Sequence, residues 1–485
     1  MSAADDLPNI ILIATDQQRS DCLGLAGHPV LQTPNLDFLG ASGTHFRSAY
    51  AEAPSCIPAR RTLISGQAPS ANGMVGFQEG VAWDPPHTIA GELSKVGYQC
   101  EMVGKMHLFP QRKRYGFHRM ALADSTRGPN NDYLDWLSGE VPTDRWAMAH
   151  GVSPNGWIAR PSHLDETQTH SFWCISQAIE FLEKRDPEMP YFLYIGFIDP
   201  HPPLTPPAFY FDRYARQELP GPVIGDWVDP DFRPRKGQDP EGPETRADLA
   251  LDDAAMHDFR AGYYGLINHV DDQVGRLVQY LRDTRLLDES FLLVTSDHGE
   301  MLGDHHMLAK AAGFDGAARI PFLARAPRSF GLPSGNVVDA PVGLQDVLAT
   351  LVDVAGAEVP AAVTGRSVLP LMGGPSAGDV EWRDVLHGEH SPAYAGDYGM
   401  HYLVDGRMKY IWHTQSGREF FFDLAGATGE ARNLVDDPEW SDHVASFRRR
   451  LVEILTDREE GFVDQGELVA GRPYRALTRP VTSGV

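Results

Sequence analysis

The chain of 485 residues is poor in cysteine, in long apolar runs and in basic residues. Its four cysteines lie far apart with no CxxC pair, which excludes a zinc knuckle and a disulfide framework. No stretch approaches the roughly 18 uninterrupted apolar residues of a membrane span. The first residues, MSAADDLPN, lack the basic and apolar segments of an export signal. These absences predict a cytoplasmic protein that does not bind membranes.

Positive charge is scarce, because 42 Lys and Arg residues face 66 Asp and Glu residues, for a net charge of -24. A protein this acidic repels polyanions at long range, which argues against nucleic acid and anionic membranes as partners. An anionic small molecule would need a local cluster of Arg, Lys, His or metal. The remaining composition, 42% hydrophobic and 22% charged, is that of a soluble globular protein.

Three apolar runs predict strands that are buried on both faces. They are NIILIAT at 9–15, YFLYIGF at 191–197 and FLLVTS at 291–296. Between the last two, apolar residues keep helical spacing from 256 to 281 and predict one long helix. Strands alternating with helices predict an α/β fold with a large, mainly parallel sheet sandwiched by helices.

Polar residues follow each of these predicted strands at its C-terminal end. The first strand leads into Asp16 and Gln17, the second into Asp199 and His201, and the third into Asp297. Ligands of open α/β sheets bind beyond the carboxyl ends of the strands. We therefore expect these side chains to converge on one site.

The pattern of the sequence changes at about residue 375, which predicts a catalytic domain at 1–375 and a small domain at 376–485. In the second part, short strand-like runs precede an amphipathic helix near 438–456, which indicates an antiparallel α+β unit. Residues 200–250 are rich in Pro and Asp and predict a surface excursion. The segment 106–173 predicts either a satellite core or a wall of the substrate site. Its tryptophans are Trp136, Trp146, Trp157 and Trp173.

The segment PSCIPAR at 54–60 contains a C-x-P-x-R pattern, and RRTLISG after it predicts a helix that places Cys56 near its N-terminus, a natural anion site. With this segment the chain resembles the type I sulfatases of the alkaline phosphatase superfamily. Further segments carry the resemblance in the family's order. They are DQ at 16–17, TPNLD at 33–37, GKMHL at 104–108, DPHP at 199–202, SDHGE at 296–300, Lys310 with FD at 314–315 and RIP at 319–321, GRMKY at 406–410, and FFDL at 421–424 with NL at 433–434.

The resemblance implies that a maturation enzyme oxidises Cys56 to formylglycine, whose aldehyde hydrates to a geminal diol. One hydroxyl of the diol attacks the sulfur of a sulfate ester and releases an alcohol or phenol. Loss of the proton of the other hydroxyl then expels inorganic sulfate by C–O cleavage. A serine at this position would be left as a stable sulfate ester.

The resemblance also implies roles for the other motif residues. Asp16, Gln17, Asp297 and His298, with modified Cys56, would bind one divalent metal, Ca²⁺ in our prediction and Mn²⁺ or Mg²⁺ as alternatives. Negative charge develops on the sulfuryl oxygens in the transition state, and positively charged side chains beside them would stabilise it. These side chains would be Arg60, Lys105 and Lys310. His107 would take a proton from the diol, and His201 would supply one to the leaving group.

A departure from the common pattern keeps an alternative open. Asp297-His298 stands where many sulfatases have Asp-Asn, and Asp-His occurs in choline sulfatases and phosphonate monoester hydrolases. A phosphonate monoester or phosphodiester hydrolase with the same nucleophile is therefore the second hypothesis. Phosphonate hydrolases lack the Lys-x-His pair that Lys105 and His107 retain, so the pair favours sulfate.

Three further expectations follow from the sequence. A non-catalytic relative of the fold is disfavoured because the set of site residues is complete. The Asp304-His305-His306 cluster is expected in a loop rather than as metal ligands. The length and the aromatic segment favour a small-molecule sulfate ester over a polysaccharide, whereas the alcohol part and a homo-oligomeric state are left open.

Overall fold

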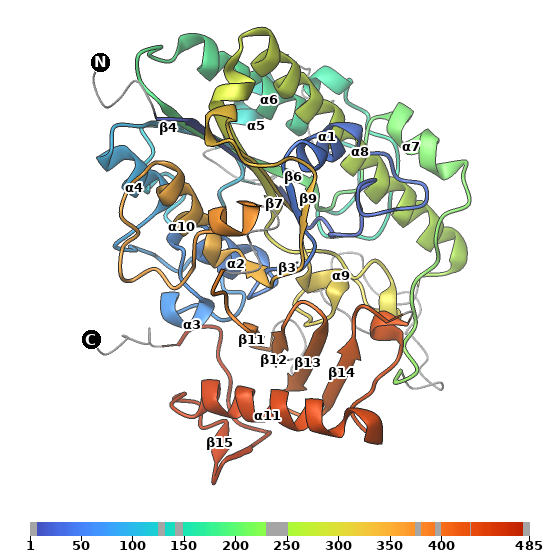
Figure 1. Cartoon of the computed structure of the whole chain (residues 1–485). Helices are drawn as coiled ribbons and strands as arrows, with labels where there is room; N and C mark the ends of the chain where they lie inside the picture. Colours follow the sequence, from blue (N-terminus) through green and yellow to red (C-terminus); the bar gives the residue numbers. More distant parts are fainter. Residues whose placement is uncertain are drawn as a thin grey trace.

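The computed structural model describes residues 7–124, 131–140, 149–228, 251–373, 380–392, 399–426 and 428–478. Figure 1 shows a large sheet with helices on both of its faces, and beneath it a smaller sheet covered by one helix. In this described part, no helix combines the length and the apolar character that crossing a membrane requires.

The described residues form one eight-stranded sheet in the order β5-β4-β6-β1-β7-β8-β2-β9. Strands β5, β4, β6, β1 and β7 run parallel, whereas β8 is antiparallel to β7 and β2. The bounds are β1 Asn9–Asp16, β2 Thr44–Phe46, β4 Gln99–Gly104, β5 Arg119–Leu122, β6 Tyr191–Pro200, β7 Ser290–Ser296, β8 Phe322–Arg325 and β9 Asn336–Val338. The mainly parallel α/β sheet predicted from the sequence is confirmed.

Alternate residues of β1 pack on opposite faces of the sheet, as the pleat of a strand requires. Ile10 and Leu12 join the core on the face covered by α2 (Cys56–Ser65), α4 (Ile89–Lys95) and α10 (Gln345–Val354). Ile11 and Ile13 join the core on the other face. That face is covered by α1 (Pro34–Ala41), α5 (Asp132–Glu140), α6 (His170–Lys184) and α8 (Asp253–Asp283). The predicted helix at 256–281 lies within α8.

A second, antiparallel sheet of four strands lies C-terminally among the described residues, in the order β11-β12-β13-β14. Its helix is α11 (Ser441–Leu455), which buries Phe447 and Leu451 against one face. The other face packs on Phe314 and its neighbours in the large body. The strands are β11 Leu386–His390, β12 Met400–Val404, β13 Met408–His413 and β14 Glu419–Asp423. The predicted boundary at 375 falls within residues 374–379, outside the described residues, and stays a prediction.

The aromatic segment 106–173 contributes to two different cores. Trp173 is buried in the core beneath the large sheet, and Trp136 packs against the same core. Trp157 instead packs on a smaller cluster around Phe259 of α8. Trp146 lies outside the described residues, as do residues 229–250 of the predicted surface excursion. Before them, α7 (Ala208–Ala215) packs on α8.

The remaining elements are short. They are β3 Ala49–Tyr50, β10 Val342–Gly343, β15 Val463–Asp464, β16 Glu467–Leu468, α3 Pro69–Asn72 and α9 Asp315–Ala318, with short 3₁₀ turns between them.

Candidate active site and metal centre

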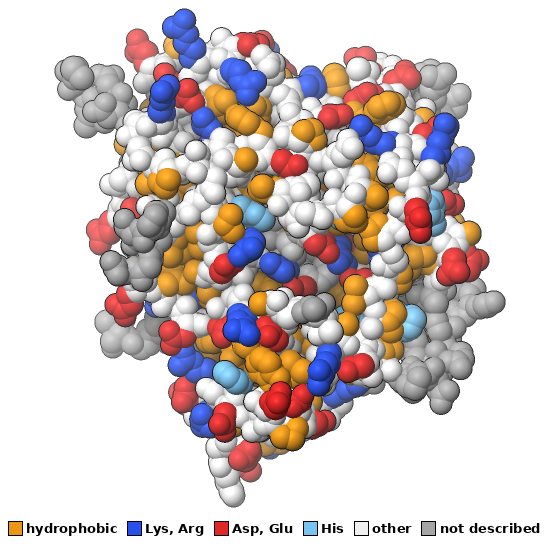
Figure 2. All heavy atoms as spheres, turned by 45° about the vertical axis from the view of Figure 1, so that its right-hand side comes forward, with side chains coloured by type: hydrophobic (Ala, Val, Ile, Leu, Met, Phe, Trp, Pro, Cys, Tyr) orange, Lys and Arg blue, Asp and Glu red, His pale blue; other side chains and the backbone are white. Residues whose placement is uncertain are grey.

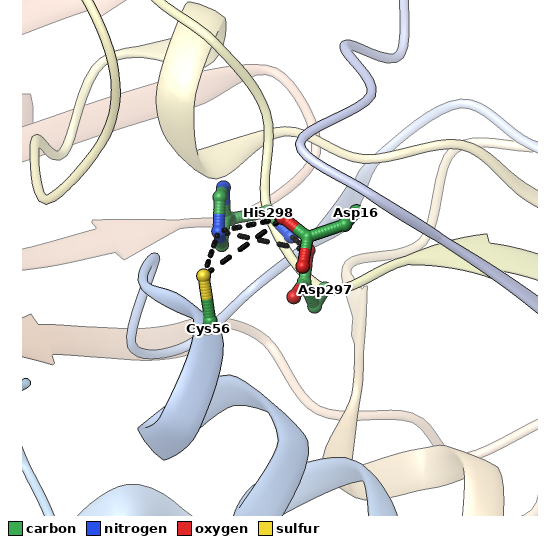
Figure 3. Close-up of side chains that lie close together, drawn as sticks. All are labelled: Asp16, Cys56, Asp297 and His298. Carbon is green, nitrogen blue, oxygen red and sulfur yellow. Dashed lines mark hydrogen bonds and ion pairs between the residues drawn. The ribbon is translucent and has the colours of Figure 1, made fainter. Parts of the chain in front are cut away.

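The ends of two neighbouring parallel strands meet the start of one helix at the candidate site. Asp16 is the last residue of β1, and Asp297 and His298 directly follow β7. Cys56 is the first residue of α2. The side chains of these four residues point toward one another (Figure 3), and their potential ligand atoms all lie within 4.8 Å. The predicted convergence at the carboxyl edge of the sheet is therefore observed for these residues.

Cys56 is buried, and its Sγ lies 3.3 Å from Nε2 of His298 and 3.8 Å from Oδ1 of Asp16. Burial, together with the negative charge of Asp16, raises the pKa of the Cys56 thiol to about 12. The thiolate is the nucleophilic form of cysteine, and it is scarce at neutral pH when the pKa is this high. The unmodified side chain is therefore poorly suited to attack an ester as a thiolate.

Arg60 lies one helical turn after Cys56 and joins the two carboxylates. Its Nε donates to Oδ2 of Asp297 at 2.9 Å, and its Nη2 donates to Oδ2 of Asp16 at 3.1 Å. Nη1 donates to the backbone oxygen of Lys105 at 2.9 Å. The side chain is fully buried, so these charge-assisted bonds are shielded from water. Arg60 therefore fixes the spacing between the strand ends and the loop after β4.

Lys105 adds a second positive charge, with Nζ 2.6 Å from Oδ2 of Asp16. Burial alone would raise the pKa of the Asp16 carboxyl. The charges of Lys105, His201, Arg60 and His298 outweigh it and hold that pKa well below its usual range. Asp16 is thus an ionised carboxylate in a buried position, and a carboxylate must be ionised to bind a metal.

His298 presents a metal-binding nitrogen to the same cluster. Its Nδ1 lies 2.9 Å from the carbonyl oxygen of Gly299, so this nitrogen carries the ring proton and Nε2 keeps its lone pair. Burial holds the pKa of His298 below its usual range, which keeps the ring neutral. Two carboxylates and a neutral imidazole, all buried, fit a divalent cation with oxygen and nitrogen ligands.

Gln17 connects the cluster to Lys310. Its backbone has a left-handed φ of 71°, and its amide oxygen accepts a hydrogen bond from Nζ of Lys310 at 2.8 Å. The amide nitrogen donates to Glu300. Glu300 also accepts the backbone N–H groups of Leu302 and Ala309, so it holds the loop that carries Lys310. The role of Gln17 as a metal ligand stays a prediction. Glu300 supports the loop of Lys310, a role that its place in the SDHGE motif did not indicate.

His107 is held in a strained conformation beside Lys105. Its φ is 54°, and Oδ1 of Asp124 accepts the N–H groups of Met106 at 2.7 Å and His107 at 3.0 Å. Strain of this kind costs about 1–3 kcal/mol and concentrates at functional sites. Burial and the charge of Lys105 hold the pKa of His107 well below its usual range, so the ring is neutral and able to accept a proton.

His201 lies in the loop after β6 and is likewise neutral. Nδ1 lies 2.7 Å from the carbonyl oxygen of Pro202, so the proton is on Nδ1 and Nε2 keeps its lone pair. Burial and the charge of Lys310 hold the pKa of His201 well below its usual range. To serve as an acid, His201 must therefore gain a proton when an anion binds beside it.

Two acidic motif residues do not join the cluster. Asp199 accepts from Oγ of Ser171 at 2.5 Å and lines a separate pocket. Asp304 accepts from Arg19 at 2.8 Å and from the backbone of Val223 at 2.9 Å. Asp304 is therefore bound by Arg19 and Val223 at the start of the short 3₁₀ turn Asp304–His306, and the expectation that this cluster does not bind metal stays a prediction.

A contact from the small sheet reaches the residue before Cys56, and nothing in the motifs indicated it. Ser55 is the N-cap residue of α2, but its side chain makes no capping bond. Its Oγ instead lies 2.7 Å from Nε2 of His390 at the end of β11, and both side chains are fully buried. Nδ1 of His390 lies 2.6 Å from the carbonyl oxygen of Ser391, so the Ser55 hydroxyl donates to Nε2. The C-terminal sheet thereby holds the start of α2, the helix that begins with Cys56.

Comparison with known proteins places this geometry in a family. Residues 8–357 match the sulfatase family model, and residues 303–457 match the model for the C-terminal part of N-sulphoglucosamine sulphohydrolase. An arylsulfatase of Clostridium perfringens is 36% identical, with 97% of this chain and 99% of the relative covered. The multifunctional alkaline phosphatase superfamily protein PehA of Trinickia caryophylli is 29% identical, with 92% and 94% covered.

Among solved structures, the phosphonate monoester hydrolase of Agrobacterium radiobacter has the same fold. It aligns with a TM-score of 0.76 at 23% identity, covering 96% of this chain and all of that chain. The sulfatase family model covers most of the large body, including every residue of the metal cluster and of its Arg60 and Lys105 partners. The chain therefore belongs to the sulfatase family of hydrolases, within the alkaline phosphatase superfamily.

Proposed function

We propose that the protein hydrolyses a small sulfate ester to an alcohol or phenol and inorganic sulfate, with formylglycine at position 56 as nucleophile. The observation that carries the proposal is the position of Cys56. It begins α2 inside a buried cluster of two carboxylates and one imidazole, and its thiol has a pKa of about 12. Cys56 lies where a nucleophile is expected, but its thiol is unreactive. This combination supports Cys56 as the precursor of formylglycine, which a maturation enzyme would form.

The donor set supports one divalent metal, and we propose Ca²⁺, with Mn²⁺ or Mg²⁺ as the alternatives. Asp16, Gln17, Asp297, His298 and modified residue 56 would hold it. The ion would supply Lewis-acid polarisation of the sulfuryl oxygens and lower the pKa of the attacking hydroxyl. The carboxylates favour a hard ion such as Ca²⁺, whereas the imidazole of His298 favours Mn²⁺.

The hydrated aldehyde of formylglycine would supply two hydroxyls, one to accept the sulfuryl group and one to release it as sulfate. Three cations would bind the sulfuryl oxygens, and their contacts with the cluster support this: Arg60 and Lys105 both contact Asp16, and Lys310 contacts Gln17. They would stabilise charge that develops in the transition state. Neutral His107 would accept the proton of the attacking hydroxyl.

His201 would protonate the departing oxygen. Its ring is neutral in the protein because burial and Lys310 disfavour the charged form. A bound sulfate ester brings negative charge to Nε2, and a nearby opposite charge favours the protonated imidazole. Substrate binding would therefore prepare the acid that the leaving group needs.

A phosphonate monoester hydrolase is the second candidate, and His298 is the observation that favours it. The similarity in fold to a phosphonate monoester hydrolase is compatible with this reading. The ion pair between Lys105 and Asp16, and His107 two residues later, favour sulfate. The two candidates share the nucleophile and the metal and differ in the group that is transferred.

A side-by-side rate screen tests the proposal. Enzyme with residue 56 shown to be modified is assayed on an aryl sulfate, choline sulfate, neutral sugar sulfates and a phosphonate monoester of the same phenol. We expect the highest kcat/KM on a sulfate ester. A higher kcat/KM on the phosphonate than on every sulfate would establish the second candidate, and inactivity on all of them would reject both.

A further inference from the structure

A second cavity of about 60 Å³ lies beyond the carboxyl end of β6. It is formed by described residues at 133, 150, 162, 164 and 169–170, by the loop after β6 and by the helix α8. The polar side chains at its wall include His150, His170, Asp199 and His269. Tyr133 and Leu266 add apolar surface. None of these residues belongs to the group of Asp16, Cys56, Asp297 and His298, which we call the nucleophile cluster.

The cavity adjoins the leaving-group side of the site. Asp199 and Pro203 line it, and His201 lies between them, two residues from each. Since consecutive Cα atoms are about 3.8 Å apart, each of these wall residues has its Cα within roughly 7 Å of that of His201. The loop that positions the proposed acid is therefore also a wall of the cavity.

The same cavity adjoins the loop of His107. His170, in its wall, is hydrogen-bonded to the backbone of Ala123, and the positive charge of nearby Lys105 helps to keep its ring neutral. The next residue, Asp124, accepts the backbone N–H group of His107. The loop of His201 thus forms part of the cavity wall, and the loop of His107 is linked to the wall residue His170 through the segment of Ala123 and Asp124.

His269 is the group that indicates a ligand. It is 1% exposed, and neither ring nitrogen has a hydrogen-bond partner among the described residues. The nearest polar contact is Oε1 of Glu166, 3.6 Å from Nε2, too long for a hydrogen bond. A buried polar group without a partner is unfavourable, and such groups are normally satisfied by a ligand or by water. The cavity therefore has a hydrogen-bonding wall that the chain itself does not complete.

The charges of the wall restrict the ligand. The described lining contains no Lys or Arg, and its one carboxyl is Asp199, whose pKa burial raises to about 6. Burial lowers the pKa values of His170 and His269 to about 3, so both rings are neutral. An anionic group would meet no positive charge here. A neutral imidazole offers one donor and one acceptor, and a hydroxyl group both donates and accepts.

We propose that this cavity, which we call the alcohol pocket, binds the alcohol part of the sulfate ester and selects an uncharged polyhydroxy alcohol such as a single neutral sugar. The inference rests on the proposed function and extends it to the substrate class. Hydroxyls of the alcohol bond to His269, Asp199 and His150. Its C–H groups lie on Tyr133 and Leu266, while the ester oxygen faces His201.

Substitution of His269 tests the pocket. His269→Leu removes both ring nitrogens at similar volume, His269→Asn keeps a donor and an acceptor, and His257→Leu is the matched control on the same helix. Each variant is assayed with nitrophenyl sulfate and with a neutral monosaccharide sulfate. We expect His269→Leu to lower the ratio of kcat/KM, sugar over aryl ester, by about tenfold, the scale of one buried hydrogen-bonded group. His269→Asn should restore part of it, and His257→Leu should leave it unchanged.

The possible outcomes distinguish failure of the alcohol-pocket inference from failure of the proposed sulfatase function. Equal losses on both esters for His269→Leu would overturn the alcohol pocket, because a merely structural histidine affects both substrates alike. Wild-type enzyme that hydrolyses nitrophenyl sulfate but no monosaccharide sulfate would overturn the pocket and leave the sulfatase reaction intact. Modified enzyme that hydrolyses no sulfate ester at all would overturn the proposed function itself. A second sulfate or a carboxylate on the sugar should lower kcat/KM, and a preference for such doubly charged esters would also contradict the inference.

Discussion

The nucleophile cluster contains ionised side chains, whereas the buried histidines of the neighbouring alcohol pocket are neutral. In the cluster, Asp16 and Asp297 are bound by Arg60 and Lys105 at hydrogen-bond distance. In the pocket, His269 is equally buried and has no hydrogen-bond partner in the described chain. The sulfuryl group is common to all sulfate esters, so the residues around it are fixed in advance. The alcohol differs between substrates, and the groups facing it are completed only by the ligand.

The space-filling view agrees with this local arrangement of charge. Lys and Arg side chains are interspersed with Asp and Glu side chains on the face in Figure 2, with no broad basic region there. The chain carries a net charge of -24, so attraction of an anionic ester depends on the buried cations of the site. Figure 2 also shows hydrophobic side chains in patches between the charged ones.

The largest expected effect comes from removing the nucleophile. Cys56→Ala should lower turnover of every sulfate ester by at least about 10⁴-fold, as loss of a covalent nucleophile does in other hydrolases. Cys56→Ser should form the sulfated enzyme once and then stall. Turnover and intact-protein mass after mixing with nitrophenyl sulfate measure both outcomes.

The matched control is Cys100→Ala, since Cys100 is equally buried but lies in the core of the large sheet. It should retain the activity of the wild type once folding is verified by circular dichroism. Multiple turnover by pure Cys56→Ala enzyme would refute the nucleophile assignment.

Metal removal should have the next largest effect, and it should act on the cluster alone. Chelation should abolish hydrolysis, and Ca²⁺ or Mn²⁺ should restore it. Asp16→Ala and Asp297→Ala should weaken metal binding most, measured by calorimetry on the apo protein. Asp304→Ala serves as the control, because Asp304 contacts Arg19 and lies outside the cluster. Full activity after verified metal removal would contradict the ligand assignment.

His201 and Lys105 should separate the leaving-group side from the sulfuryl side. Nitrophenolate departs without much help, whereas an alkyl alkoxide needs a proton. His201→Ala should therefore lower kcat/KM for an alkyl sulfate more than for nitrophenyl sulfate, by roughly 10²–10⁴-fold, the range of general acid catalysis. Lys105→Ala should lower both values about equally, because the charge it opposes is common to both esters. Equal losses for His201→Ala on the two esters would show that His201 is not the acid.

The smallest effect should come from the contact between the two sheets. Ser55→Ala and His390→Phe each break the bond that holds the start of α2, and each should lower kcat about tenfold, as displacement of a positioned group does. KM should change little, because neither residue touches the ester. His390→Gln keeps an acceptor and should recover part of kcat.

A double-mutant cycle completes that test. If Ser55 and His390 act as one unit, the double variant should be no worse than the poorer single variant. Additive losses would show that the two residues act independently and that the contact does not position the nucleophile.

Local patterns were sufficient to predict the elements that carry the chemistry. The apolar runs before Asp16 and Asp297 became β1 and β7, which pair in parallel with Thr15 opposite Ser296. Parallel pairing brings the C-terminal ends of the two strands together, so Asp16 and Asp297, the proposed metal ligands, converge because β1 and β7 are neighbours. The helix predicted from RRTLISG at 60–66 begins four residues earlier, at Cys56, so Cys56 lies at its N-terminus as expected.

Other features depended on contacts that no local pattern encodes. Ser55 and His390 are 335 residues apart in sequence, and only the packing of the C-terminal sheet on the large body joins them. Asp199 belongs to the same motif as His201, yet it accepts a hydrogen bond from Ser171 and lines the alcohol pocket, whereas Nδ1 of His201 is bonded to the carbonyl oxygen of Pro202. The unpartnered state of His269 is a property of the tertiary fold, since its position in α8 is that of an ordinary buried helix residue.

The most direct test of the account is the relation between modification of residue 56 and activity. Formylglycine lowers the mass of the peptide by about 18 Da relative to cysteine, so mass spectrometry gives the modified fraction of any preparation. Preparations made with different amounts of a maturation enzyme should show turnover of nitrophenyl sulfate proportional to that fraction, with a line through the origin. Full turnover by a preparation in which residue 56 is entirely cysteine would contradict the account.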